Sequence, residues 1–215
     1  MQNCRQLKLQ GHSNNGPHLV RPDPELENKT WVYCNQEFEG GWLVIQRRYG
    51  NSLDFDQSWV WYKNGFGNIS TEFWIGNEVL HQLTRDTAYE LLILFKNGDG
   101  TVRKTGCDFL NVSTETDNYR LVLGHCLGSD AESLSYSNLT TFSTRDVGRG
   151  LGGLNCEKSL VGGWWYASCD SLRINGDFPP CSAPGSCVET KMLIRPNKGI
   201  KKPHRLTHLT HTPPY

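Results

Sequence analysis

Eight cysteines are the residues whose type and spacing point most directly to a chemistry in this chain of 215 residues. None of them forms a CxxC pair, and their spacings do not fit a zinc knuckle. An even number of such cysteines instead predicts disulfide bonds, which persist in oxidising compartments. We therefore expect all eight thiols to be paired: Cys4, Cys34, Cys107, Cys126, Cys156, Cys169, Cys181 and Cys187.

Four asparagines begin Asn-x-Ser/Thr triplets without a central proline, which is the acceptor pattern for N-linked glycans. They are Asn28, Asn68, Asn111 and Asn138. One such triplet often occurs by chance, but four beside an even set of cysteines predict a secreted, extracellular glycoprotein. Each asparagine is expected on a surface turn, and burial of its side chain in the core would exclude that site.

The other polar residues show no catalytic or nucleic-acid-binding pattern. No G-x-S-x-G, HExxH or phosphate-binding glycine loop occurs, and the seven histidines are scattered or lie near prolines in the tail. Acidic and basic residues balance at 22 each, and the single basic cluster lies at Lys198–Arg205. No apolar run approaches the roughly 18 residues of a membrane span. The sequence thus predicts no enzyme, no nucleic-acid partner and no membrane span.

The pattern of apolar residues predicts mainly antiparallel strands. Residues 30–35 and 40–50 indicate two strands joined at Gly40-Gly41, because β-branched and aromatic residues cluster there. Residues 88–109 contain an Asn-Gly-Asp-Gly turn between two apolar runs, which is typical of a hairpin. Residues 118–126 add a further strand. A short helix is expected from Gly76 onward.

Two regions contain few apolar residues. Ser129 to Gly163 is rich in Gly, Ser and Asn, and is expected to be a long irregular loop closed by cysteines. Residues 197–215 form a basic, proline-containing tail that we expect to be disordered. The folded domain is accordingly predicted to span residues 1–196.

Several segments together resemble the fibrinogen C-terminal domain family, which includes ficolins, tachylectins, angiopoietins and tenascin tips. They are GGWLVIQRRYG, WVWYKNGFG, EFWIGNEVL, AYELLILF, LTTFSTRDVG, LNCEKSLVGGWWYASCDSLRING and KMLIRP. The resemblance runs from about Cys4 to Pro196. It implies an α+β fold stapled by disulfides: an N-terminal subdomain with a small sheet, a central twisted antiparallel sheet with short helices, and a loop-rich C-terminal subdomain that carries ligand sites.

The resemblance also implies two disulfides, Cys4 with Cys34 and Cys156 with Cys169. Cys107 and Cys126 fall on strands that should be adjacent, so a third bond is expected between them. Cys181 and Cys187 flank the turn SAPGS and are the remaining pair, although spacing alone does not fix this connectivity.

The resemblance places a ligand pocket at VGGWWYASCD, residues 161–170. Some lectins of the family bind acetylated groups there, and an acetyl methyl group favours aromatic walls while its amide favours rigid backbone groups. The candidate lining is Trp164, Trp165, Tyr166, Ser168, Cys169 and Asp170. Asp170 replaces a histidine that is common in the family. The alternative is that Trp164 and Trp165 are core residues, because large aromatic side chains are usually buried.

A calcium loop accompanies this pocket in the family, and here the sequence departs from the pattern. Of its several acidic residues only Asp146 remains, followed by Val147-Gly148-Arg149-Gly150. Calcium requires six to eight oxygen ligands, usually including two or more carboxylates. We therefore expect a vestigial site that binds calcium weakly or not at all, and we assign no firm cofactor.

Two functional classes fit these features. The first is a lectin-like module of innate immunity that binds acetylated or microbial glycans. The second is a secreted signalling or extracellular-matrix ligand that binds a cell-surface protein receptor, although the Trp-rich stretch of angiopoietins between Gly176 and Met192 is absent. No collagen-like or heptad repeat occurs, so an oligomer would need a stalk outside this chain.

Overall fold

The computed structural model describes residues 3–21, 29–37, 39–50, 52–147, 161–167, 174–176, 187–197 and 199. Its helices are α1 (Cys4–Leu9), α2 (Trp59–Asn64), α3 (Asn77–Thr84), the 3₁₀ helix η1 (Glu115–Asp117) and α4 (Ala131–Ser135). Its strands are β1 (Gly16–Val20), β2 (Thr30–Asn35), β3 (Trp42–Arg48), β4 (Phe66–Gly67), β5 (Phe73–Trp74), β6 (Tyr89–Asn97), β7 (Val102–Val112), β8 (Leu121–Leu123), β9 (Cys126–Gly128) and β10 (Cys187–Pro196).

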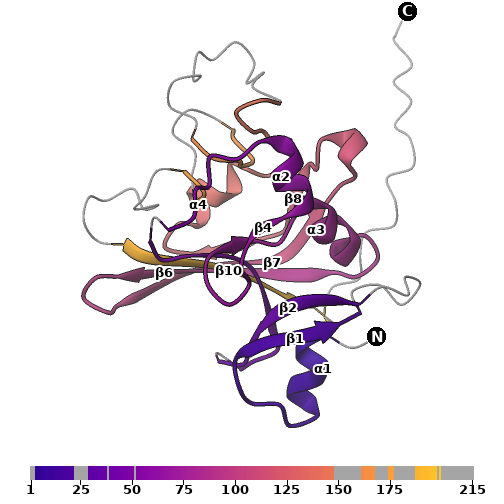
Figure 1. The fold of residues 1–215 in the computed structure, drawn as a ribbon, viewed down its shortest axis with the longest axis vertical. Helices are drawn as coiled ribbons and strands as arrows, with labels where there is room; N and C mark the ends of the chain where they lie inside the picture. The colour runs from indigo at the N-terminus through magenta and orange to yellow at the C-terminus, as the bar shows by residue number, and fades with distance from the viewer. Residues whose placement is uncertain are drawn as a thin grey trace, which may run out of the picture.

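One antiparallel sheet organises the whole molecule. Its strands follow the order β1-β2-β3-β10-β6-β7-β8, while β5 also pairs with β3 and β4, and β9 pairs with β7. The last strand in sequence, β10, therefore lies in the middle of the sheet (Figure 1). The predicted α+β architecture with a twisted antiparallel sheet and short helices is confirmed.

The predicted strands and the helix lie where the residue pattern placed them. The expected hairpin is β6–β7, with its turn at residues 97–100, and β2 and β3 pair across Gly40-Gly41. Helix α3 begins directly after Gly76, whose φ of 105° favours glycine. The expected strand at 118–126 is divided into β8 and β9, both paired with β7.

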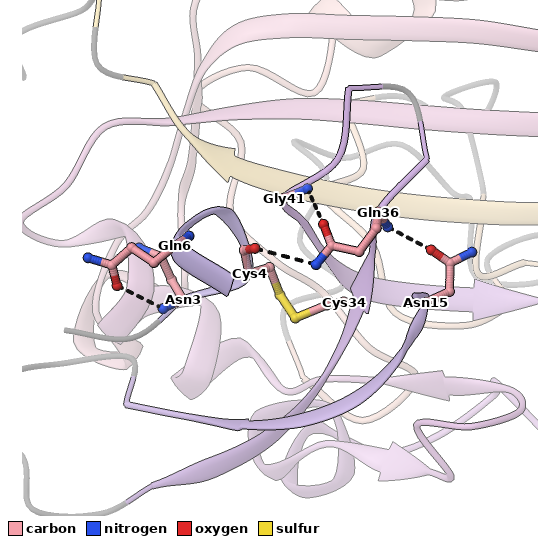
Figure 2. Close-up of a disulfide and its surroundings, with 7 residues drawn as sticks. All are labelled: Asn3, Cys4, Gln6, Asn15, Cys34, Gln36 and Gly41. Carbon is pink, nitrogen blue, oxygen red and sulfur yellow. Dashed lines mark hydrogen bonds between the residues drawn. A yellow bond between two sulfur atoms is a disulfide. The ribbon is translucent and has the colours of Figure 1, made fainter. Parts of the chain in front are cut away.

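Strands β1 and β2 form one end of the sheet, helix α1 lies against one side of it, and the Cys4–Cys34 disulfide links α1 to β2 (Figure 2). This bond is the one that the family resemblance implied. Gln36 supports it, because its side chain donates to the Cys4 carbonyl oxygen at 3.5 Å and accepts from the Gly41 nitrogen at 2.8 Å. Helix α1 packs on β3 and β10.

The other side of the sheet carries α2, α3 and α4 (Figure 1). Between them and the strands lies an aromatic core that includes Tyr62, Trp74 and Phe142, all nearly inaccessible to solvent. Burial of such rings is the main source of stability in a fold of this kind. In the described part of the chain no helix is long and apolar enough to cross a membrane.

The expectation of an irregular loop over residues 129–163 is wrong in part. Helix α4 lies within it, and the side chains of Leu134 and Phe142 are buried. Ser143 forms an antiparallel bridge with Trp164. Two isolated apolar residues were therefore enough to anchor this polar segment. Residues 148–160 and most of the predicted tail lie outside the described residues, but Asn197 donates hydrogen bonds to the Ala88 and Asp108 carbonyl oxygens, both at 2.8 Å.

Candidate ligand-binding site

The three consecutive aromatic residues of the candidate site are buried. Trp164, Trp165 and Tyr166 are 0%, 1% and 2% exposed. The Trp165 ring lies 5.4 Å from that of Trp164 and 4.9 Å, edge to face, from that of Phe142. Its indole nitrogen donates to the Tyr119 carbonyl oxygen at 2.7 Å. Both tryptophans thus lie in the core, as the alternative interpretation of this segment expects.

The backbone around these rings is fixed on both sides. Trp164 exchanges two backbone hydrogen bonds with Ser143, at 3.0 and 3.1 Å. The Tyr166 hydroxyl lies 2.9 Å from each of the Val161 and Gly162 carbonyl oxygens and shares its one proton between them, which folds the segment onto itself. These hydrogen bonds hold the backbone of residues 161–166 in place.

Close packing against neighbouring segments requires glycine at the two positions before the aromatic residues. Gly162 has a φ of 77°, and a Cβ there would lie 2.1 Å from the Asn175 carbonyl oxygen. A Cβ on Gly163 would lie 2.7 to 2.8 Å from carbon atoms of the Tyr62 ring. No real Cβ tolerates such distances, so the Gly-Gly pair lets segment 161–167 lie directly against α2 and residues 174–176.

A buried polar network ties residues 174–176 to the sheet. The Gln46 side chain donates to the Asn175 Oδ1 and the Thr190 Oγ1, each at 3.2 Å, and Asn175 donates to the Gly163 carbonyl oxygen at 3.0 Å. The guanidinium of Arg48 donates to the Gly176 carbonyl oxygen and lies 4.8 Å above the Phe55 ring centre. Buried hydrogen bonds between distant segments, such as these, favour one arrangement of the chain.

Tyr62 sits at the centre of this arrangement. Its hydroxyl donates to the Phe55 carbonyl oxygen at 2.7 Å, and its ring lies under Gly163. Burial raises the pKa of Tyr62 far above its ordinary value, so the hydroxyl stays protonated. The residue is a structural support and not an acid or base.

Asp146 has a structural task at the edge of the same region. Its Oδ1 accepts hydrogen bonds from the Trp59 nitrogen at 2.9 Å and the Thr144 hydroxyl at 2.8 Å. Partial burial acts to raise the pKa of Asp146, but these two hydrogen bonds, together with a further backbone hydrogen bond and the charge of Arg145, lower the pKa overall. Trp59 is the first residue of α2, and the side chain of the preceding Ser58 makes no capping hydrogen bond. Asp146 therefore caps α2 from a distant loop.

The described residues around Asp146 do not form a set of calcium ligands. Asp56 is engaged by the Gly162 nitrogen at 3.3 Å and by Arg145, whose nitrogen lies 3.7 Å from its Oδ2. Within the described ranges no three His, Cys, Asp or Glu side chains group as a metal site. One carboxylate already holding two hydrogen bonds does not meet the need of calcium for six to eight oxygens.

Several candidate residues lie outside the described part of the chain. They are Ser168, Cys169 and Asp170, together with Cys156, Cys181 and the sequon residue Asn28. Cys107 and Cys126 are bonded, as their expected positions on adjacent strands predicted. Cys187 also belongs to a disulfide.

The three described sequons differ in their surroundings. Asn68 is exposed in the turn between β4 and β5, and its Oδ1 accepts from the Ser70 nitrogen. Asn138 follows α4, is half-buried and accepts from the Leu123 nitrogen. The expectation of a surface turn is wrong for Asn111, which lies within β7 and donates from its Nδ2 to the Thr84 carbonyl oxygen at 2.7 Å.

Sequence reasoning missed the residues that hold the site in place. Gln46, Asp56, Tyr62 and Asn175 come from four separate segments, and each looks ordinary in its own sequence context. One signal was available: the apolar strand β3 ends in the polar run Gln46-Arg47-Arg48, of which Gln46 and Arg48 are buried and therefore need partners on another segment.

The chain is similar to several known proteins. The profile of the C-terminal globular domain of fibrinogen beta and gamma chains matches residues 1–186. Human angiopoietin-related protein 6 is 38% identical over 176 residues, and human ficolin-3 is 38% identical over 179 residues. These alignments cover 81% and 82% of this chain, but the chain spans only 37% and 59% of the lengths of these relatives.

The three-dimensional comparison agrees. The fibrinogen-like globe domain of human ANGPTL6 superposes with a TM-score of 0.80 at 32% identity, covering 89% of this chain and 93% of that chain.

Proposed function

Because the chain belongs to the family of fibrinogen C-terminal globular domains, we propose that it is an extracellular recognition module, not an enzyme, that binds acetylated or microbial glycans in innate immunity. Location outside the cell is supported by the Cys4–Cys34 and Cys107–Cys126 disulfides, which persist in oxidising compartments. Its similarity to a ficolin supports the lectin-like role.

One observation carries the proposal: segment 161–167 is held rigidly immediately before Ser168, Cys169 and Asp170. Its backbone is bonded to Ser143, its glycines touch Tyr62 and Asn175, and its Tyr166 hydroxyl closes the turn. A segment that is already held in place loses little conformational entropy when a ligand binds beside it. The segment is therefore a suitable base for a small polar ligand such as an acetamido group.

The buried rings refine the assignment of roles. Since Trp164, Trp165 and Tyr166 are covered, we assign them the positioning of the backbone, and we assign the ligand contacts to Ser168, Cys169 and Asp170. In this proposal binding does not require calcium, because Asp146 is committed to α2.

A glycan array tests the proposal. Acetylated glycans and their deacetylated counterparts would be presented with calcium and with a chelator. We expect retention of acetylated glycans under both conditions and loss of retention in Asp170→Ala. Equal binding of acetylated and deacetylated glycans, or of neither, would overturn the lectin-like role.

A second candidate function is that of a ligand for a protein receptor. It is favoured by Val60 and Trp61, neighbours on α2 that are 61% and 56% exposed. Exposed tryptophan is enriched among residues that dominate protein interfaces. Similarity to an angiopoietin-related protein agrees with this role.

Binding of the labelled chain to cultured cells distinguishes the two functions. Binding that survives glycosidase treatment, is lost after surface proteolysis and weakens in Trp61→Ala would support the receptor role. Binding lost after glycosidase alone, with Trp61→Ala unchanged, would rule it out.

A further inference from the structure

A row of cationic side chains crosses the outer face of the sheet, on the side away from α2 and α3. In the strand register Lys104 of β7 pairs with Leu94 of β6, Leu94 with Lys191 of β10, and Lys191 with Arg47 of β3. Directly paired residues in a sheet point to the same face. Four neighbouring strands thus contribute three cations and one leucine to a line about 14 Å long at the usual strand spacing.

A second row, two residues along, lies on the same face. It contains Val102, Lys96 and Glu189, again in direct register. The intervening residues Phe95 and Thr190 are buried on the helix side, which confirms that both rows face outward. Between the rows is a hollow of about 380 Å³ lined mainly by Leu94, Lys96, Val102, Glu189 and Lys191.

Positive charge predominates on this surface. The Oε1 atom of Glu189 lies 3.0 Å from the Lys191 ammonium and 3.4 Å from the Arg47 guanidinium, so two cations share one carboxylate. Lys96 and Lys104 are exposed, and no carboxylate of the described residues forms an ion pair with Lys96. Glu37, which also lines the hollow, is the other acidic group here. Among the described residues, the two rows and the hollow thus contain the cations Arg47, Lys96, Lys104 and Lys191 and two carboxylates.

Aromatic rings border the row at the Arg47 end. The Arg47 guanidinium lies 5.7 Å from the Tyr33 ring centre and 5.2 Å from that of Tyr49. Tyr49 is 44% exposed, and Trp31, two residues before Tyr33 on the same strand and hence on the same face, is 59% exposed. Charged and aromatic groups together offer ionic contacts and flat apolar surfaces.

From this arrangement we propose that the outer sheet face, which we call the cationic face (Arg47, Lys96, Lys104 and Lys191 with Tyr33 and Tyr49), is a binding site for a sulfated polysaccharide. Sulfate groups spaced along an extended chain match cations spaced along a row of strands. The C–H faces of sugar rings pack well on exposed tyrosine and tryptophan rings, which a lipid headgroup or an acidic peptide would not use in the same way. The residues of the cationic face are not those assigned to the lectin-like site, and this proposal does not depend on the lectin-like role proposed above.

Isothermal titration of the full chain with a heparin decasaccharide tests the proposal. At about 0.15 M salt, where surface charges are screened beyond roughly 8 Å, we expect measurable binding that weakens as salt is raised. The double variant Lys96→Gln with Lys104→Gln should bind at least tenfold more weakly. The slope of log affinity against log salt should fall by about one per lysine, as for other polyelectrolyte ligands.

The matched control is Arg85→Gln with Arg145→Gln, which removes two charges elsewhere on the molecule. It should keep the affinity within about twofold by the same reasoning. An equal loss in both double variants, or no binding by the unmodified chain at this salt concentration, would overturn the proposal. Tyr49→Ala should weaken binding without changing the salt slope, because it removes packing and not charge.

Two further ligands define the specificity. An uncharged dextran oligosaccharide should not bind. An oligothymidylate of similar charge should bind more weakly than the decasaccharide. Equal affinity for the two ligands would mean that the surface attracts polyanions in general and is not a polysaccharide site. The Lys96→Gln, Lys104→Gln variant should still bind acetylated glycans. This result would show that a loss of heparin binding is independent of the lectin-like site.

Discussion

The Oδ1 atom of Asp146 lies 2.9 Å from the backbone nitrogen of Trp59, 87 residues earlier in the chain, and accepts its hydrogen bond. This contact joins the start of α2 to the loop that precedes the C-terminal segments. It gives a structural reason for an acid that the sequence alone suggested as the remnant of a calcium loop.

Asp146→Ala should destabilise the fold by about 1 kcal/mol, the usual effect of losing a helix cap. Asp146→Asn retains an Oδ1 acceptor and should lose only a few tenths of that amount at neutral pH. Urea unfolding of the three proteins measures the difference. Equal stability of the alanine variant and the unmodified chain would contradict the capping role.

The same variants should also differ in how their unfolding free energy depends on pH. The pKa of Asp146 is lower in the folded chain than its ordinary value near 3.8. The contribution of the ionised carboxylate to the unfolding free energy is therefore fully present above that pH. It is lost as the pH falls through the lowered folded pKa. The unfolding free energy of the unmodified chain should thus decline more steeply in this acidic window than that of Asp146→Asn.

Calcium binding to the Asp146 loop should be weak or absent, because the carboxylate is already hydrogen-bonded and Arg149 adds a cation nearby in sequence. Calorimetric titration with calcium should give no micromolar affinity. Micromolar affinity that disappears in Asp146→Ala would show this prediction to be wrong.

Gly163→Ala should destabilise the chain by about 1 to 3 kcal/mol, the typical cost of overpacking a core. The reason is the 2.7 Å approach of the added Cβ to the Tyr62 ring. Gly98→Ala is the control, since its Cβ would meet only an ordinary contact with Val188 at 3.7 Å. A similar midpoint of urea unfolding for both variants would mean that segment 161–167 is not tightly packed.

Much of the fold could be predicted from local patterns. The Asn-Gly-Asp-Gly turn and the alternating residues of β6 and β7 determine their own hairpin, and Gly76 marks the start of α3. Strand β10 could not be placed in this way, because its position between β3 and β6 depends on pairing with residues about 90 to 150 positions earlier.

The candidate site was less predictable for the same physical reason. A Trp-Trp-Tyr run reads equally well as a pocket wall or as core, and only its packing against Phe142, Tyr119 and Trp74 decides that the rings are buried. The capping role of Asp146 likewise could not be predicted from the neighbouring sequence, because α2 lies 87 residues earlier in the chain. Roles that depend on long-range contacts are invisible to local patterns.

N-linked glycans should occupy Asn68 and not Asn111. The exposed turn leaves Asn68 accessible, whereas the Nδ2 of Asn111, the atom that would carry the sugar, points into the Thr84 carbonyl oxygen. Peptide mass mapping after enzymatic deglycosylation of chain secreted from eukaryotic cells distinguishes the two sites. Full occupancy of Asn111 in folded material would contradict the position of its side chain.

The most direct test of the central claim is equilibrium binding of oligomers of N-acetylglucosamine, compared with the same oligomers after deacetylation, in the presence of a calcium chelator. We predict binding of the acetylated oligomer alone, loss of this binding in Asp170→Ala, and no change in the Lys96→Gln, Lys104→Gln variant. Binding that requires calcium, or that does not distinguish the acetylated from the deacetylated oligomer, would contradict the account.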